Sequence, residues 1–169
     1  MTEIVDNYLN IYELNTLKDN LISDKFPLYY SNNVTGTYKQ TGDDYWNCYF
    51  FHTFYENNKP QSTLFDKIYN IFIPKFEKKG KIKSLLRIKL NYYPHTETLR
   101  EHGQHVDDGF SHHGAVFSLN TCDGFTRLHD GTKVNSIENR ILFFDPSIEH
   151  NSSTTTNSSG RWNINFNFI

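Results

Sequence analysis

Apolar and polar residues follow two different patterns along the chain, and the change lies near Gly80. Before it, residues 62–76 carry apolar side chains at steps of three and four, which predicts a helix capped by Ser62. A shorter helix is predicted to begin at Asn15-Thr16, and residues 45–55 alternate like a strand. The first eighty residues are therefore expected to hold the few helices of the protein.

After Gly80 the chain has short runs of strand composition, bounded by Gly, Pro, Asp or Asn: 84–93, 114–120, 125–128, 140–144 and 162–168. Many short strands separated by turns are typical of a sandwich or barrel. A length of 169 residues suits one domain. We expect a mainly β protein with N-terminal helices (α+β), in which residues 1–80 support a β core formed by residues 81–169.

Composition narrows the function classes. Tyr and Phe dominate an aromatic content of 16%, which favours strands. The net charge of -2 gives no electrostatic reason to expect nucleic acid or an anionic membrane as a partner. No apolar run reaches the length of a membrane span and no signal peptide is recognisable, so we expect a cytoplasmic protein. Two cysteines, Cys48 and Cys122, indicate neither a disulfide framework nor a four-thiolate zinc site.

The most informative pair of residues is His105 and Asp107. Alternate residues of an extended strand point to the same face, so a His-x-Asp sequence predicts an imidazole and a carboxylate side by side. His150 follows Asp107 after three predicted strands and is the candidate third ligand. Two imidazoles and one carboxylate on one face leave coordination positions open, as Fe(II) needs when it also binds a co-substrate and O₂.

Arg161 stands on the last predicted strand, where polar and apolar residues alternate. It shares a face with Asn163, Asn165 and Asn167, which indicates a polar interior on that side. A guanidinium in a partly dry cavity requires an anion, and a carboxylate is its natural bidentate partner. The alternative interpretation is a surface arginine on an edge strand.

Together these residues resemble the Fe(II)/2-oxoglutarate-dependent dioxygenases, in particular their prolyl 4-hydroxylase-like branch. The resemblance covers residues 85–168 and rests on Asn91-Tyr92-Tyr93-Pro94, His105-Val106-Asp107, the runs 115–120 and 140–144, His150 and Arg161. It implies a double-stranded β-helix, which is a jelly roll. It also implies that His105, Asp107 and His150 bind the iron and that Arg161 anchors 2-oxoglutarate.

The resemblance implies further co-substrate contacts. Tyr93 matches a tyrosine that hydrogen-bonds 2-oxoglutarate, although a slip of one residue would put Tyr92 there instead. Ser118 stands where close relatives have a second co-substrate tyrosine, and its shorter hydroxyl allows a contact through water. Asn163 and Asn165 are candidate donors from the last strand. His102, His112 and His113 are candidates to line the substrate opening.

The activity implied is hydroxylation of an unactivated C–H bond with release of succinate and CO₂, using Fe(II), 2-oxoglutarate and O₂, with ascorbate as a supporting reductant. A prolyl residue in a peptide or protein is the first substrate expected, and a free amino acid or other small metabolite is the alternative. Residues 108–111 and the Asn/Ser/Thr-rich residues 151–160, interpreted as a flexible loop, are expected to set specificity. Two other hypotheses are a non-catalytic jelly-roll binding module and a cupin-like metalloenzyme that does not use 2-oxoglutarate. Oligomeric state is not predicted.

Overall fold

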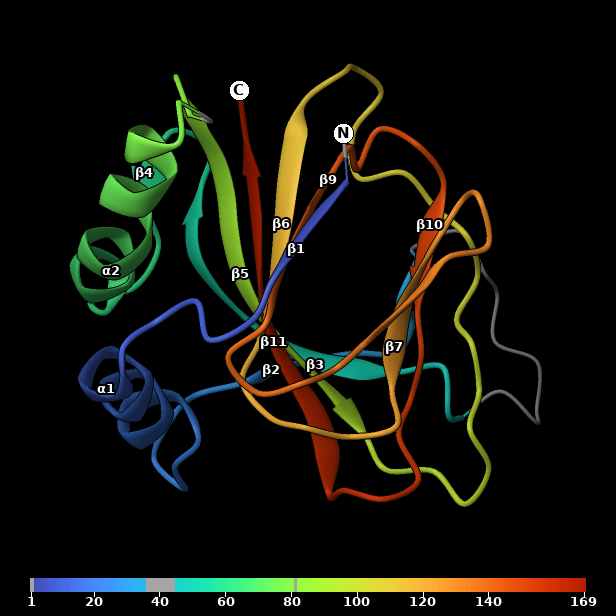
Figure 1. Cartoon of the computed structure of the whole chain (residues 1–169). Helices are drawn as coiled ribbons and strands as arrows, with labels where there is room; N and C mark the ends of the chain where they lie inside the picture. The colour runs from blue at the N-terminus through green and yellow to red at the C-terminus, as the bar shows by residue number, and fades with distance from the viewer. Residues whose placement is uncertain (1, 36–44, 81) are drawn as a thin grey trace.

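The computed structural model describes residues 2–35, 45–80 and 82–169, and consists of two antiparallel sheets that face each other, with two helices (Figure 1). The major sheet has the strand order β1 (Glu3–Val5), β9 (Ile141–Phe144), β6 (His113–Ser118), β11 (Gly160–Phe168), β5 (Leu85–Pro94), β3 (Tyr49–Glu56) and β2 (Tyr29–Ser31), and β4 (Lys59–Pro60) pairs with β3. The minor sheet has the order β10 (His150–Ser152), β7 (Phe125–Leu128) and β8 (Lys133–Asn135). This arrangement confirms the predicted mainly β jelly roll.

The core lies between the major sheet and the helices α1 (Ile11–Leu21) and α2 (Phe65–Lys78), which cover the face of that sheet away from β7 and β10 (Figure 1). On β11, Ile164, Phe166 and Phe168 are almost completely buried. The ring of Phe166 lies 4.7 Å from that of Phe72 in α2. Burying each such side chain stabilises the fold by roughly 1.5–3 kcal/mol. The apolar half of the β11 alternation therefore fixes which face is left for polar residues.

Both helices begin at places other than those predicted. In α1 the cap is Asn10, whose side chain accepts hydrogen bonds from the N–H groups of Tyr12 and Glu13, while Glu13 accepts from the Asn10 N–H. This capping box satisfies the free N–H groups that an Asn15-Thr16 start would have left unpaired. The prediction that α1 begins at Asn15-Thr16 was wrong. In α2 the cap position is Leu64, and Ser62 accepts a hydrogen bond from its N–H outside the helix.

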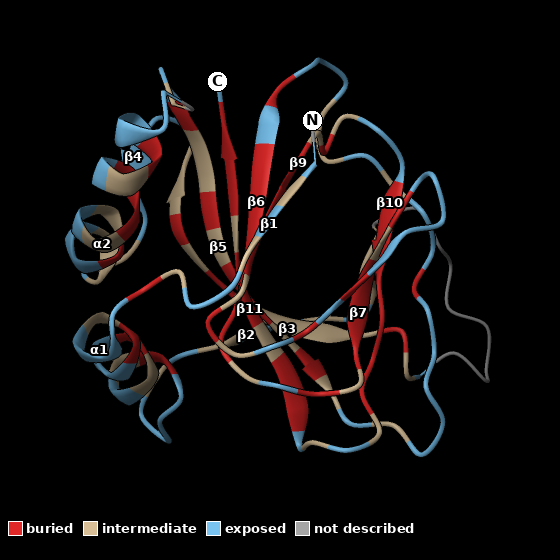
Figure 2. Ribbon diagram, in the orientation of Figure 1, coloured by how far each residue is buried: buried red, intermediate tan, exposed pale blue. Residues whose placement is uncertain are grey.

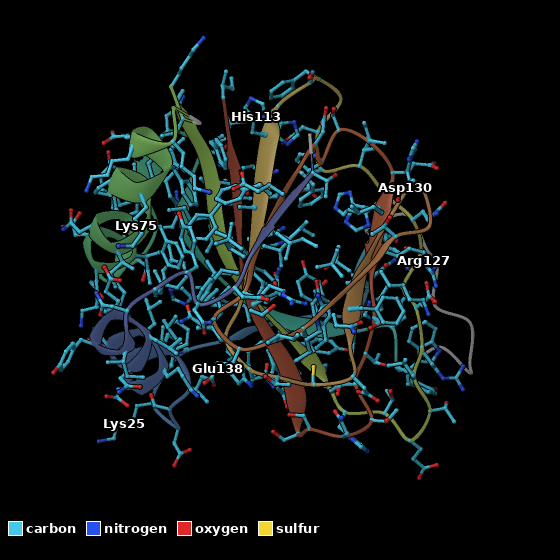
Figure 3. The ribbon with its side chains drawn as sticks, viewed as in Figure 1. Lys25, Lys75, His113, Arg127, Asp130 and Glu138 are labelled. Carbon is cyan, nitrogen blue, oxygen red and sulfur yellow. The ribbon has the colours of Figure 1, made fainter. Side chains whose placement is uncertain are left out.

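Ion pairs connect the helices to their surroundings. Lys75 of α2 pairs with Glu13 of α1 at 2.7 Å, and Lys18 pairs with Glu138 in the loop before β9. Figure 3 labels Lys75 and Glu138. These side chains remain partly exposed, so each pair contributes at most about 1 kcal/mol. The packing of apolar side chains, rather than these pairs, holds the helices in place.

The five strand runs predicted after Gly80 correspond to β5, β6, β7, β9 and β11, with shifts of a few residues at their ends. The short strands β1, β2, β8 and β10 were not predicted. The N-terminal part also contributes more than support, because β1 pairs with β9 and β3 pairs with β5 within the major sheet.

Two other local predictions were wrong. His105 and Asp107 do not lie on a regular strand: His105 forms an isolated bridge with His150, and Asp107 lies in a bend. Residues 151–160 are not a solvated flexible loop either. They begin within β10, whose residues are buried (Figure 2). Ser153, Thr154 and Thr155, which follow β10, have no exposed surface. Their hydroxyls find partners inside the protein, as where Thr155 donates to Asp123 at 2.6 Å.

Candidate metal centre

His105, Asp107 and His150 lie together, although 43 residues separate the last two. Each offers a ligand atom, and these three atoms lie within 4.8 Å of one another. The Nε2 atoms of His105 and His150 are 3.7 and 3.8 Å from Oδ1 of Asp107. The backbones of His105 and His150 exchange two hydrogen bonds of 3.0 Å, which draws the two distant segments together. Among the described residues, this is the one group of three or more His, Cys, Asp or Glu side chains placed closely enough to hold a metal ion.

Backbone carbonyls orient both imidazoles. Nδ1 of His150 lies 3.0 Å from the carbonyl oxygen of Ile148, and Nδ1 of His105 lies 3.4 Å from that of Gly103. A carbonyl oxygen only accepts, so each Nδ1 carries the hydrogen and each Nε2 presents its lone pair to the cluster. Burial, followed by the neighbouring His150, lowers the pKa of His105, which keeps that imidazole in the neutral form that binds metals.

The two oxygens of Asp107 have different partners. Oδ2 accepts a hydrogen bond from Nδ2 of Asn167 at 2.9 Å and lies 3.1 Å from the guanidinium of Arg87. Oδ1 points to the two histidines and is left for a metal ion. Burial by itself raises the pKa of Asp107, but Arg87 and the other neighbours outweigh it and lower the pKa below its usual value. The carboxylate is therefore charged and fixed for binding through one oxygen.

Asn167 itself is held by a second acceptor. Its Nδ2 lies 3.0 Å from Nε2 of His112, whose Nδ1 lies 2.8 Å from the carbonyl oxygen of Phe110. Nδ1 of His112 thus carries the hydrogen, and Nε2 accepts one from Asn167. The amide group of Asn167 is locked between His112 and Asp107, so it acts as a positioning residue for the carboxylate.

A polar cavity connects this cluster to Arg161. It lies between the polar face of the major sheet and β10, and its lining includes Asn91, Tyr93, His105, Val116, Thr126, His150, Asn151, Ser152, Arg161, Asn163 and Asn165. The two candidate imidazole ligands and the guanidinium therefore face one shared space. Most of its walls can hydrogen-bond, so it suits a small polar molecule more than an apolar one.

Arg161 is a buried cation without an anion. It is 1% exposed, donates to the carbonyl oxygen of Phe125 at 2.7 Å and to the hydroxyl of Thr126 at 2.8 Å, and lies 5.6 Å from the ring of Tyr93. Its Nε is buried without a hydrogen-bond partner, and no carboxylate of the described residues lies within ion-pair distance. Burial lowers its pKa from the usual value. An anion entering the cavity would offset this cost.

Gly124 provides the space that Arg161 occupies. A Cβ atom at this position would lie 2.7 Å from the carbonyl oxygen of Thr154 and 2.8 Å from Cδ of Arg161. Real Cβ atoms do not approach other atoms so closely, so a side chain here would displace the arginine or the backbone. The absence of a side chain at Gly124, just before β7, thus leaves the space in which the Arg161 side chain lies.

A scan against family models and a search of curated proteins give no match. Solved structures do match over nearly the whole chain. One is a viral collagen prolyl hydroxylase from Paramecium bursaria Chlorella virus-1, with 13% identity, a TM-score of 0.60, and coverage of 99% of this chain and 96% of that one. Another is a prolyl hydroxylase from Trichoplax adhaerens in complex with a peptide fragment of hypoxia inducible factor, with 11% identity, a TM-score of 0.65, and coverage of 99% and 83%.

The chain has the fold of the Fe(II)/2-oxoglutarate oxygenases. The same fold is found in an α-ketoglutarate-dependent epimerase of nogalamycin biosynthesis, with 10% identity, a TM-score of 0.66, and coverage of 99% of this chain and 77% of that one. Proteins with this oxygenase fold therefore carry out different reactions, and the reaction of this chain has to be argued from its own residues.

Within the oxygenase fold, the cross-strand register decides between the two tyrosines. Tyr93 stands opposite Arg161 and lines the cavity. Tyr92 points to the other face, where its ring lies 4.4 Å from that of Trp162 and its hydroxyl donates to the carbonyl oxygen of Ser159 at 2.8 Å. The candidate co-substrate tyrosine is therefore Tyr93.

The other predicted residues of the site lie at different depths. Asn163 and Asn165 both line the cavity. Ser118 is buried directly opposite Asn163 but is not among the lining residues. His102, predicted near the substrate opening, is buried instead, and its Nδ1 lies 2.8 Å from the hydroxyl of Ser152. Its ring lies 5.1 Å from that of Tyr93, so it supports the cavity wall from behind.

The sequence patterns did not predict roles in the site for Asn91, Arg87 or Asn167. Asn91 lines the cavity and donates to Asn163 across the strands at 3.2 Å. The available signal was the alternation in residues 87–93, where polar side chains occupy every second position, matching the polar face of β11. Aligning the two alternations would have placed Arg87 opposite Asn167, next to the candidate ligands.

Proposed function

We propose that the chain is an Fe(II)- and 2-oxoglutarate-dependent oxygenase. The observation that carries this proposal is the shared cavity, with His105 and His150 on its wall and an unpaired, buried Arg161 lining the same space. A site for Fe(II) alone would not require a buried cation, and a site for a dicarboxylate alone would not require two neutral imidazoles with a fixed carboxylate. The combination suits a metal and an anionic co-substrate bound together.

The residues have separate roles in this proposal. Nε2 of His105, Nε2 of His150 and Oδ1 of Asp107 would hold the iron, with Asn167 fixing the second oxygen of the carboxylate. Arg161 would bind the distal carboxylate of 2-oxoglutarate, with Tyr93 beside it and Asn163 and Asn165 as additional donors. A bound iron, with 2-oxoglutarate and O₂, would supply the oxidising power for hydroxylating a substrate C–H bond, coupled to the conversion of 2-oxoglutarate into succinate and CO₂.

A prolyl residue is the substrate that we propose first. Two matched structures, from a Chlorella virus and from Trichoplax adhaerens, are prolyl hydroxylases, and the second was solved with a peptide. The alternative is a free amino acid or another small metabolite, and the matched epimerase acts in the biosynthesis of a small molecule. Among the described residues, no helix is long and apolar enough to cross a membrane.

Anaerobic titration tests the class of enzyme. Addition of Fe(II) and 2-oxoglutarate is expected to produce a weak visible charge-transfer band, which requires the keto acid and the iron to be in direct contact. A non-catalytic jelly-roll module would give no band, and a cupin-like enzyme would bind metal without responding to 2-oxoglutarate.

Variants test the ligand assignment. His105→Ala and Asp107→Ala should abolish iron-dependent succinate formation while leaving the fold intact, and His129→Ala, in an exposed turn, is the matched control. Undiminished succinate from either of the first two variants would refute the assignment. A screen of peptides and metabolites for succinate release, followed by a mass gain of one oxygen atom, would then identify the substrate.

A further inference from the structure

Two cations of β5 lie near the proposed iron site: Arg87, which pairs with Asp107, and Lys89, which has no role in the site described above. Arg87 and Lys89 lie on the polar face of the strand, directly opposite Asn167 and Asn165 of β11. Asn165, the cross-strand partner of Lys89, lines the cavity, and Arg87 lies 3.1 Å from Oδ2 of Asp107. The polar face of β5 thus carries two cations beyond Asn91 and Tyr93, the residues of this strand that line the cavity.

Lys89 lacks an anionic partner. Its Nζ lies 3.5 Å from the hydroxyl of Tyr49, at the limit of a hydrogen bond, and 5.3 and 5.9 Å from the ring centroids of Tyr49 and Phe51. No carboxylate of the described residues lies within 4.0 Å of it, and Glu56, on the neighbouring strand, is beyond that distance. Aromatic faces compensate a partly buried ammonium only in part.

Arg87 also has hydrogen-bond donors that are not used within the protein. One of its terminal nitrogens lies 3.1 Å from Asp107, but its Nε is buried and has no hydrogen-bond partner. A guanidinium has five N–H groups in a planar fork, so it can contact Asp107 and still offer donors to another acceptor.

The charges of the complete site do not balance. Three cations, Arg87, Lys89 and Arg161, lie around the site, against two carboxylates, that of Asp107 and the more distant one of Glu56, which leaves an excess of one positive charge. Fe(II) and the 2-oxoglutarate dianion have equal and opposite charges, so binding both leaves this excess unchanged. In a partly buried site, an anionic group on a further molecule would be strongly attracted.

We propose that Lys89 and Arg87 bind a carboxylate of the substrate, so that the substrate is a prolyl compound with a carboxylate next to its ring. This inference rests on the proposed oxygenase function and narrows its substrate class. The rings of Tyr49 and Phe51 beside Lys89 provide an apolar surface against which a pyrrolidine ring can pack while its carboxylate meets the ammonium group. The carboxylate can belong to free proline or to an acidic residue beside a prolyl residue in a peptide.

The experiment compares acids with their neutral amides. Calorimetry under argon, on protein loaded with Fe(II) and 2-oxoglutarate, would measure binding of L-proline against L-prolinamide, and of a blocked Asp-Pro peptide against the matching Asn-Pro peptide. Because hydrogen bonds to charged groups are about twice as strong as neutral ones, at least one acid should bind about 10- to 100-fold more tightly than its amide. The pair that shows the preference identifies the source of the carboxylate.

Variants assign the preference to Lys89. K89M keeps the aliphatic stem but removes the charge, so the ratio between acid and amide should fall to near one, while K89R should restore most of it. K133M is the matched control, because Lys133 also lies over an aromatic ring, that of Phe125 at 4.4 Å, but on the minor sheet. Binding of 2-oxoglutarate should be unchanged in K133M.

The outcomes separate the two proposals. Equal binding of acid and amide, no binding of any of the four compounds, or an unchanged preference in K89M would each overturn the inference. The comparison within the unaltered protein does not depend on any variant folding. Absence of the charge-transfer band with an intact acid preference would instead count against the oxygenase function alone.

Discussion

Replacing Arg161 with methionine should separate the role of this residue in folding from its role in binding. In the unliganded protein the change removes a buried cation, which is favourable, and leaves Phe125 O and Thr126 Oγ1 without their donor, which is not. An unsatisfied buried acceptor costs about 1–3 kcal/mol, similar in size to the desolvation that is relieved. We therefore expect the free energy of unfolding of the unliganded variant to stay within about 2 kcal/mol of the original.

Binding of 2-oxoglutarate should change far more. A bidentate guanidinium–carboxylate pair has two charge-assisted hydrogen bonds, so its loss costs about 3–5 kcal/mol, or at least a hundredfold in Kd. At a concentration of 100 times Kd, 2-oxoglutarate stabilises the original protein by about 2.7 kcal/mol, which raises Tm by about 5–11 °C for a chain of this size. The same concentration should raise the Tm of the variant by only about 1 °C.

Thermal unfolding of the iron-loaded protein under argon, with and without 2-oxoglutarate, measures this difference. Arg140→Met is the control, because Arg140 pairs with Asp6 on the surface at 2.6 Å and should leave the shift intact. A full shift in Arg161→Met would refute the assignment of the anchor.

Three further changes test the surroundings of the site. Asn167→Leu removes the donor to Asp107 Oδ2, so the affinity for Fe(II), measured by competition with a chelator, should fall about 10- to 100-fold. Gly124→Ala should weaken 2-oxoglutarate binding by displacing Arg161, whereas Gly109→Ala, with no atom within 4 Å of the new Cβ, should not; equal affinities in calorimetry would contradict this reasoning. His102→Phe tests a pH effect: burial lowers the pKa of His102 to about 3, so below pH 6.5 the unfolded state takes up a proton that the folded state does not. Stability should then fall by about 1.4 kcal/mol per pH unit from this residue between pH 6 and 4, and denaturant titrations should show a smaller loss in the variant.

The sequence was sufficient to predict which side chains of the last strand, β11, point to the core and which point to the polar side of the sheet. Because side chains alternate with a period of two, Trp162 and Ile164 had to point away from Arg161 and Asn163, and the structure has them so. The same alternation along β5 left open which of two adjacent tyrosines enters the cavity. That choice depends on the pairing of β5 with β11, which is a long-range property.

The His-x-Asp motif predicted that His105 and Asp107 lie together, which they do, but the predicted local structure was wrong. The two side chains were expected to share a strand face, but the local backbone is an isolated bridge followed by a bend. What brings His105 to His150 is a pair of backbone hydrogen bonds between segments that no local pattern connects. Local periodicity therefore identified the donors but not how they meet.

Residues 151–160 show why composition misled. Asn, Ser and Thr are frequent in loops because their side chains hydrogen-bond readily, and water is the usual partner there. Here the partners are internal: Ser153 Oγ accepts from the N–H of Phe125, and Thr154 Oγ1 accepts from that of Arg100. A Ser or Thr residue looks the same in the sequence whether its hydroxyl hydrogen-bonds to water or to a group inside the protein. Only the fold distinguishes the two cases.

The pairing of β5 with β11 couples the fold to the proposed chemistry. Four successive cross-strand pairs on the polar face lead from the co-substrate anchor to the residues around Asp107: Tyr93–Arg161, Asn91–Asn163, Lys89–Asn165 and Arg87–Asn167. The opposite face of β11 is fixed in the core by Phe166 and Phe168. A register slip of one residue would therefore expose the core and at the same time turn every one of these polar groups away from the cavity. For this reason the apolar core residues of β11 hold the site in place although none of them lines the cavity. Replacing a small core residue next to Phe166 with a larger one should therefore weaken the binding of both 2-oxoglutarate and the metal.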